Sequence, residues 1–260
     1  MSHYTVLVIT EDGNYEKALE PFDENLEVEQ YIKKTKEEII KEEKKRYEKR
    51  SDKDSEYCQN VDWSDDNSIV KHYFEYWEEE HDENYNELSS YNPNSKYDWY
   101  QLGGRWAGSL KLKNGAEKEK DSELSWYNCY EDVPEGYTDH AQFKDIDLTP
   151  DKEQVEKAKR FWEVVVEGQP KQEGEKFDTF WKPEYYKEQY GDKETYIKCQ
   201  TELFACALLY KGEWIEAGQM GWFACKNSTK ESEEEYRKNF YEVISNLKPT
   251  DYLSMVDCHI

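Results

Sequence analysis

The sequence predicts an α+β protein built on a mostly antiparallel sheet. Apolar, β-rich segments stand at both ends of the 260-residue chain, amphipathic helical stretches alternate with them, and no internal repeat is found. In chain order the elements near the ends give β-α-(insertion)-β-β-α-β, which is the ferredoxin-like order. We therefore expect one elaborated domain over 1–260, with a core of 1–50 and 200–260 and a large mixed insertion of about 51–199.

The N-terminal elements are a strand and two helices. Tyr4–Thr10 is apolar on both faces, as in a central strand. Turn-forming residues follow at Pro21–Asn25. An apolar stripe in an otherwise charged segment predicts a long helix over Glu27–Arg50, and a second helix is expected over Ser64–Glu80.

The middle of the chain is less regular. A strand is predicted over Trp106–Lys113, ending in an Asn-Gly turn, and the polar residues 116–148 follow without a clear pattern. Thr149–Val166 has a helical apolar stripe with a proline at its start. The aromatic-rich residues 177–190 fit a helix or a loop equally well.

The C-terminal quarter has a plainer pattern. Leu203–Tyr210 is an apolar strand, and Glu213–Glu216 returns as its hairpin partner. Gly221–Cys225 is predicted as a further strand, Ser232–Leu247 as a helix and Tyr252–Ile260 as a final strand. These elements complete the second half of the predicted core.

The composition is strongly acidic and rich in aromatic residues. Lys and Arg number 35 against 59 Asp and Glu, so the formal net charge is -24. Such a chain repels phosphate backbones and anionic membrane surfaces, which argues against direct nucleic-acid or membrane binding and favours a partner with a basic face. With 22 Tyr and 9 Trp, we expect a core built from aromatic residues rather than from Leu and Ala.

The sequence also predicts the compartment. No apolar stretch approaches the roughly 18 residues of a membrane span, and the first residues lack the pattern of a signal peptide. The six cysteines are scattered without a Cys-x-x-Cys pair, which is typical of thiols in a reducing cytoplasm. We expect a soluble, intracellular protein.

Common catalytic signatures are missing from the sequence. It contains no Gly-x-x-x-x-Gly-Lys-Ser/Thr, Gly-x-Gly-x-x-Gly, Gly-x-Ser-x-Gly or His-Glu-x-x-His motif. His72, His81 and His140 have no partner at metal-ligand spacing, so neither a metal nor a cofactor is expected. The missing catalytic set favours a binding protein over an enzyme.

One segment, Asp98–Trp106, could form a ligand site. Its two glycines allow close approach of the backbone, and the arginine that follows offers a fork for phosphate or carboxylate. Trp222, which lies between glycines and another aromatic residue, could add a ligand wall. The alternative is a tight turn with Arg105 paired to Asp98 and both indoles in the core. The candidate ligand-binding residues are Asp98, Trp99, Gly103, Gly104, Arg105, Trp106 and Trp222.

A second candidate lies near the C-terminus. Asp257 and His259 are two residues apart on a predicted strand, so both project from one face. A carboxylate beside an imidazole could move protons in catalysis. The alternative is a structural pair at the end of a sheet.

Four segments of the chain are distinctive: His3–Ile9 with Pro21–Asn25, Tyr91–Trp106, Gly221–Phe223 and Val256–Ile260. Together they resemble a family of uncharacterised proteins common in tailed bacteriophages and prophages. Tyr97 stands where relatives tend to carry Trp, which is a mild departure. The resemblance implies a phage or prophage gene acting in the cytoplasm of a bacterial host, and it carries over no functional residues.

Three functions remain open. The first is a host-directed phage protein that binds and inhibits a bacterial defence complex, or one that handles nucleic acid, through protein–protein contacts. The second is an enzyme or sponge for a nucleotide-like small molecule, with Arg105 on phosphate, a tryptophan on the base, and His259 with Asp257 moving protons. A virion or assembly component is the third alternative. The second function requires Arg105 and His259 to lie on the same side of the fold.

Overall fold

A computed structural model describes residues 2–59, 61–124, 133–219 and 227–260. The chain forms two compact units. We call Met1–Pro21 with Lys96–Ile260 the sheet unit and Phe22–Ser95 the helical unit. The sequence places the start of the insertion at about residue 51, whereas the second unit begins at Phe22.

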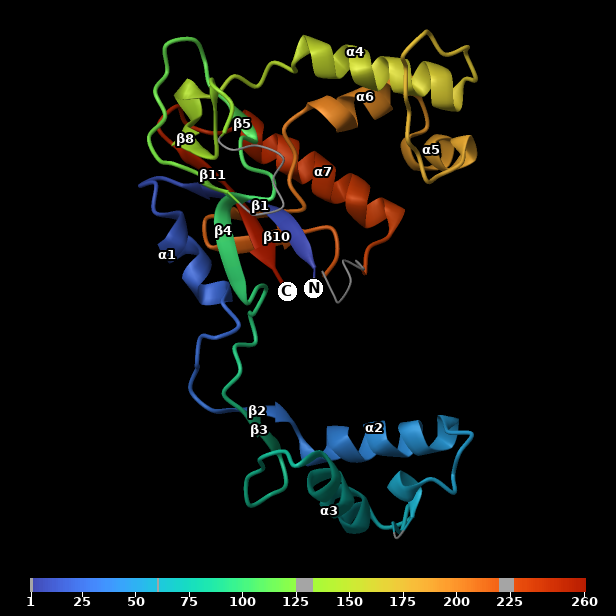
Figure 1. Cartoon of the computed structure of the whole chain (residues 1–260). Helices are drawn as coiled ribbons and strands as arrows, with labels where there is room; N and C mark the ends of the chain where they lie inside the picture. Colours follow the sequence, from blue (N-terminus) through green and yellow to red (C-terminus); the bar gives the residue numbers. More distant parts are fainter. Residues whose placement is uncertain (1, 60, 125–132, 220–226) are drawn as a thin grey trace. The chain divides into compact units, whose positions relative to one another are not determined.

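The sheet unit is built on a seven-stranded mixed sheet (Figure 1). Strand order is β10-β9-β1-β11-β4-β6, and β8 also pairs with β11. This confirms the α+β class, while the ferredoxin-like order stays a prediction. The strands are β1 (His3–Thr10), β4 (Trp99–Gly104), β6 (Glu123–Leu124), β8 (His140–Gln142), β9 (Ala207–Tyr210), β10 (Glu213–Glu216) and β11 (Tyr252–His259).

β1 is a central strand, as its apolar sequence predicts. It pairs in parallel with β9 and, along its whole length, antiparallel with β11. The pairing runs from His3 opposite His259 to Thr10 opposite Tyr252. The first and last strands of the chain therefore lie side by side, and both termini are at the same end of the sheet (Figure 1).

Helix α7 (Lys230–Ser245) packs on one face of this sheet. Leu7 and Met255 join Phe240 of α7 in the main hydrophobic cluster. Most members of this cluster are aliphatic, so the expectation of an aromatic core is wrong for the sheet. Aliphatic side chains prevail because the central strands are rich in Val, Leu and Ile. On the opposite face, Tyr15 of α1 (Tyr15–Leu19) makes an edge contact with the ring of Tyr100.

Three helices beyond the sheet carry the aromatic packing that the composition predicts. Tyr196 of α6 stacks against Phe161 of α4 at a centroid distance of 5.5 Å, and Trp162 is also in contact. The helix predicted from Thr149 begins instead at Lys152, because the Asp151 side chain caps it by accepting hydrogen bonds from two backbone N–H groups. The elements are α4 (Lys152–Phe161), a π-helical turn (Trp162–Val166), α5 (Pro183–Tyr190) and α6 (Lys193–Thr201).

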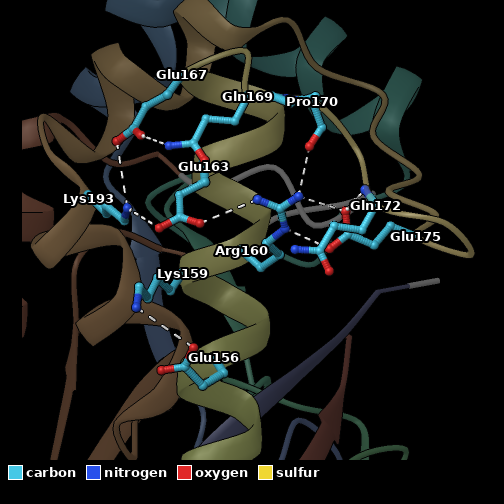
Figure 2. A network of polar contacts seen from close by, with 10 residues as sticks. All are labelled: Glu156, Lys159, Arg160, Glu163, Glu167, Gln169, Pro170, Gln172, Glu175 and Lys193. Carbon is cyan, nitrogen blue, oxygen red and sulfur yellow. Dashed lines mark hydrogen bonds and ion pairs between the residues drawn. The ribbon is translucent and has the colours of Figure 1, made fainter.

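A polar network fixes α4 to α6 and to the loop between them (Figure 2). Arg160 donates two hydrogen bonds, of 2.6 and 2.9 Å, to the carboxylate of Glu175 and a third to the carbonyl of Pro170. Glu163, in the π-helical turn that follows α4, accepts a hydrogen bond of 2.6 Å from Lys193 at the start of α6. A bidentate Arg–Glu pair that is partly buried holds a defined geometry better than a single exposed ion pair.

The helical unit contains β2 (Tyr31–Lys34), α2 (Lys36–Lys49), α3 (Asp66–Trp77) and β3 (Glu87–Ser89). The helix predicted from Glu27 therefore starts later than expected. Thr35 and Glu38 form a capping box at its first turn, and the preceding residues pair with β3 instead. The carboxylate of Glu87 is fully buried, where it accepts a hydrogen bond from Tyr73 at 2.7 Å and lies 2.6 Å from Lys33.

Two further strand predictions have different outcomes. The strand predicted over Trp106–Lys113 is wrong at its start, because β4 lies upstream and ends at Gly104. The strand predicted over Gly221–Cys225 lies outside the described residues. The remaining elements are short strands β5 (Leu110–Lys111) and β7 (Tyr137–Thr138) and 3₁₀ turns at Glu20–Phe22, Glu56–Cys58 and Phe143–Asp145. Within the described ranges, no helix has the length and apolar character needed to cross a membrane.

Candidate functional site

Side chains from three strands meet at the end of the sheet that holds the termini. His3 of β1 is opposite His259 of β11, which is opposite Trp99 of β4. Residues directly opposite each other on paired strands share a face of the sheet. One row along, Thr5 is opposite Asp257. These side chains share the sheet face on which Leu7 and Met255 pack against α7.

The first histidine is held by a buried carboxylate. Nδ1 of His3 lies 2.8 Å from Oδ1 of Asp257. The second oxygen of Asp257 accepts the backbone N–H of Arg105 at 2.9 Å. Since the Asp257 side chain is 0% exposed, both of its oxygens need such partners. Asp257 thus links the first strand to the turn after β4.

The second histidine has its own carboxylate. Nδ1 of His259 lies 2.6 Å from Oδ1 of Asp98, and the indole of Trp99 stacks on the His259 ring at 5.1 Å. The rings of His3 and His259 are 4.9 Å apart between centroids. We call His3, Asp98, Asp257 and His259 the double His–Asp cluster.

This geometry corrects the pairing expected from sequence. Asp257 and His259 do share a face, but Asp257 bonds His3, and His259 bonds Asp98. Sequence reasoning missed His3 as a site residue. A usable signal was present: His3 starts an apolar strand and His259 ends another of equal length, so full antiparallel pairing would place them opposite each other.

The Gly-Gly turn is shaped by buried carboxylates. Gly103 and Gly104 have φ of +77° and +52°, which favours glycine. A Cβ on Gly104 would lie 2.9 Å from Cγ of Asp257, and a Cβ on Gly103 would lie 2.9 Å from Cγ of Asp139. The close backbone approach expected for a ligand is thus made toward the protein's own side chains.

Asp139 fixes the chain that follows this turn. Its carboxylate accepts the N–H groups of Gly108 and Ser109 at 2.7 and 2.8 Å and the hydroxyl of Ser122 at 2.6 Å. Burial raises the pKa of Asp139, and the hydrogen bonds from Ser122 and from the two N–H groups act against that rise. The segment that carries Arg105 and Trp106 is therefore held at both ends, by Asp257 and by Asp139.

A cavity of about 370 Å³ lies beside the cluster. Thr5 and Met255 line it from the sheet, and Trp106 lines it from the turn. Trp106 is 40% exposed and Arg105 is also exposed. The other walls are Gly108, Ser109, Leu110, Lys111, Tyr137, residues 146–151, Gln154 and residues 200–204.

The arrangement can move protons. Because each Nδ1 is engaged by a carboxylate, Nε2 is the ring nitrogen left for another partner, as in hydrolases with an Asp-oriented histidine, and the two side chains are 7% and 6% exposed. Two such imidazoles 4.9 Å apart can serve one reacting group as base and acid. Among the described residues, no group of three or more His, Cys, Asp or Glu has the geometry to hold a metal ion.

The structure thus brings together most of the residues predicted for the two candidate sites. His259 contacts both Asp98 and Trp99, and the backbone N–H of Arg105 is bonded to Asp257. Trp106 lies on the neighbouring cavity wall, and Trp222 lies outside the described residues. Comparisons with protein-family models, curated proteins and solved structures found no match for this chain.

Proposed function

We propose that this protein binds a nucleotide-like phosphate ester and acts on it by general acid–base chemistry with His3 and His259. The observation that carries this proposal is the pair of neighbouring imidazoles in edge contact, each fixed through Nδ1 by an aspartate. A further support is that the backbone N–H of Arg105 is bonded to Asp257, two residues from His259.

Hydrolysis of a phosphate ester suits two imidazoles. One, neutral, takes a proton from water through Nε2 as the oxygen attacks phosphorus. The bond from phosphorus to the leaving oxygen then breaks, and the other, as imidazolium, gives its proton to that oxygen. The products are an alcohol and a phosphate with one ester bond fewer, and at the end of the step the base imidazole is protonated and the acid imidazole is neutral.

Nearby side chains suit the rest of such a ligand. The exposed Arg105 can offer a planar fork to phosphate oxygens. Trp99 and Trp106 are 41% and 40% exposed, and each presents an indole on which a flat ring can stack. Although the net charge of the chain is -24, these cationic and aromatic groups form a local site that suits an anionic ester.

Turnover of defined esters tests this function. Nucleoside monophosphates and dinucleoside phosphodiesters are incubated with the protein and followed by ³¹P NMR. We expect consumption of at least one class, lost in His3→Asn and in His259→Asn and kept in His81→Asn, which lies in the helical unit. If the protein binds an ester without turning it over, its function is sequestration of the ester and not catalysis. Neither binding nor turnover of any ester contradicts the proposal.

A second candidate function is inhibition of a bacterial host complex in the host cytoplasm, including an anti-phage defence complex. The observation that favours it is an exposed aromatic group ahead of and within α5. Phe180 is 91% and Trp181 52% exposed, and Trp181 stacks on Tyr185. Exposed aromatic anchors are typical of protein interfaces, and the acidic chain favours a basic partner.

Affinity capture from a bacterial lysate tests this second function. The wild-type chain should recover one stoichiometric partner, and a Phe180→Ala/Trp181→Ala variant should lose it. Recovery of no stoichiometric partner by the wild-type chain contradicts it.

A further inference from the structure

The cavity beside the double His–Asp cluster is placed to receive the rest of the ligand. Thr5 and Met255 line it. On the shared sheet face, Thr5 is the next residue along β1 from His3, and Met255 is the next along β11 from Asp257. Two residues along a strand span about 7 Å. A phosphate held at the imidazoles therefore leaves a group of nucleoside length over Thr5 and inside the cavity.

The walls of the cavity offer ring surfaces and free amides. Phe204 lines the cavity, and Arg237 lies over its ring at 4.4 Å from the centroid. Gln154 of α4 and Gln200 of α6 also line the cavity, and their side-chain amides have no hydrogen-bond partner among the described residues. An amide carries both a donor and an acceptor, which matches the edge of a nucleobase.

Charge decides which end of a nucleotide enters. Asp147, Asp151 and Glu202 place three carboxylates on the walls against one cation, Lys111, whose Nζ lies 2.8 Å from Asp147. The hydrogen bonds from Lys111 and Thr149 lower the pKa of Asp147, so it is ionised at neutral pH. This lining repels phosphate and attracts N–H donors.

We propose that this cavity is the nucleobase subsite and that it selects bases with an exocyclic amino group. The amide and ring surfaces bind the base, and the carboxylates accept from its amino group. The inference rests on the proposed function, because the phosphate must be held at the imidazoles for the base to reach these walls.

Calorimetric titration with three matched ligands tests the inference. AMP carries an amino group, purine riboside 5′-monophosphate lacks that group alone, and ribose 5-phosphate lacks the base. We expect AMP to bind about tenfold more tightly than purine riboside 5′-monophosphate, as one hydrogen bond to a charged acceptor implies. The double variant Gln154→Ala/Gln200→Ala should lower the affinity for AMP about tenfold and leave the affinity for ribose 5-phosphate unchanged. The control is Gln172→Ala, at an exposed glutamine outside the cavity, which should change neither affinity.

The outcomes separate this inference from the proposed function. If ribose 5-phosphate binds as tightly as AMP, or if the double amide variant weakens both equally, the subsite is wrong while the phosphate site stands. Equal binding of AMP and purine riboside 5′-monophosphate overturns the amino-group preference. If none of the three ligands binds, both proposals fail.

Discussion

The imidazole of His3 and the carboxylate of Asp257 are hydrogen-bonded at 2.8 Å although 254 positions separate them in the sequence. Both side chains are buried, and the same carboxylate also holds the backbone of Arg105. One residue therefore sets the orientation of a histidine and the position of an arginine. Several predictions about the double His–Asp cluster depend on this contact.

Asp257→Asn should disable the cluster. An amide cannot accept from both Arg105 N–H and His3 Nδ1–H, because one of its two terminal groups is itself a donor. We expect kcat/KM for a hydrolysed ester to fall about 10²–10⁴-fold, the range of general acid–base catalysis. Asp178→Asn, at an exposed position, is the control. Wild-type kinetics in Asp257→Asn would show that the contact has no part in the reaction.

The pH dependence of kcat/KM should be bell-shaped. One histidine must be neutral to act as base and the other protonated to act as acid, so the rate falls at both extremes. When the base is replaced by Asn, the pH profile of the residual kcat/KM should lose its acidic limb. When the acid is replaced by Asn, the profile should lose its basic limb. Profiles in which His3→Asn and His259→Asn lose the same limb would contradict this division of roles.

Gly104→Ala should destabilise the sheet unit more than Gly115→Ala does. Both glycines have positive φ, so both substitutions carry the backbone strain of about 1–2 kcal/mol. At Gly104 a Cβ also overlaps Asp257, whereas at Gly115 no atom lies within 4 Å. The difference between the two free energies of unfolding, measured by urea denaturation, isolates the overlap. Equal losses would mean that Asp257 does not press on the turn.

Glu87→Gln should destabilise the helical unit in a pH-dependent way. Burial raises the pKa of Glu87, but the hydrogen bonds from Lys33 and Tyr73 outweigh it and lower the pKa below its ordinary value of 4.5. The charged group therefore adds stability that is present above pH 4.5 and lost as the pH falls through the lower, folded-state pKa. We expect a loss of about 1–3 kcal/mol at pH 7 that shrinks toward pH 3.

Urea titrations followed by the amide signals of α2 and α3 in NMR spectra measure this difference. Glu75→Gln is the matched control, since Glu75 forms an exposed pair with Lys71 at 3.7 Å. A loss at pH 3 as large as that at pH 7 would contradict the assignment of the stability to the ionised carboxylate.

The sequence predicted strands and single residues better than it predicted their partners. β1 could be predicted from the apolar run within Tyr4–Thr10 and β11 from the mostly apolar Tyr252–Val256, and the alternation of side chains placed Asp257 and His259 on one face. The partner of Asp257 was missed because pairing between the first and last strands is a tertiary choice, for which the equal length of the two strands is the only signal in the sequence. The strand predicted over Trp106–Lys113 was misplaced for a related reason, since the turn after β4 is shaped by buried carboxylates that lie 30 and 152 residues along the chain from the N–H groups that they bind.

The helix predicted from Glu27 shows a different limit. Its first residues have charged and apolar side chains that fit a helix, yet Tyr31–Lys34 pairs with Glu87–Ser89. Lys33 thereby reaches the buried Glu87, and this contact outweighs a weak local preference.

Nitrogen-15 NMR of the histidine rings during titration with AMP tests most directly whether His3 and His259 form one ligand site. We expect the Nε2 signals of both residues to move together with one saturation curve, while those of His72 and His81 in the helical unit stay fixed. Movement of one ring alone, or of neither at saturating AMP, would contradict it.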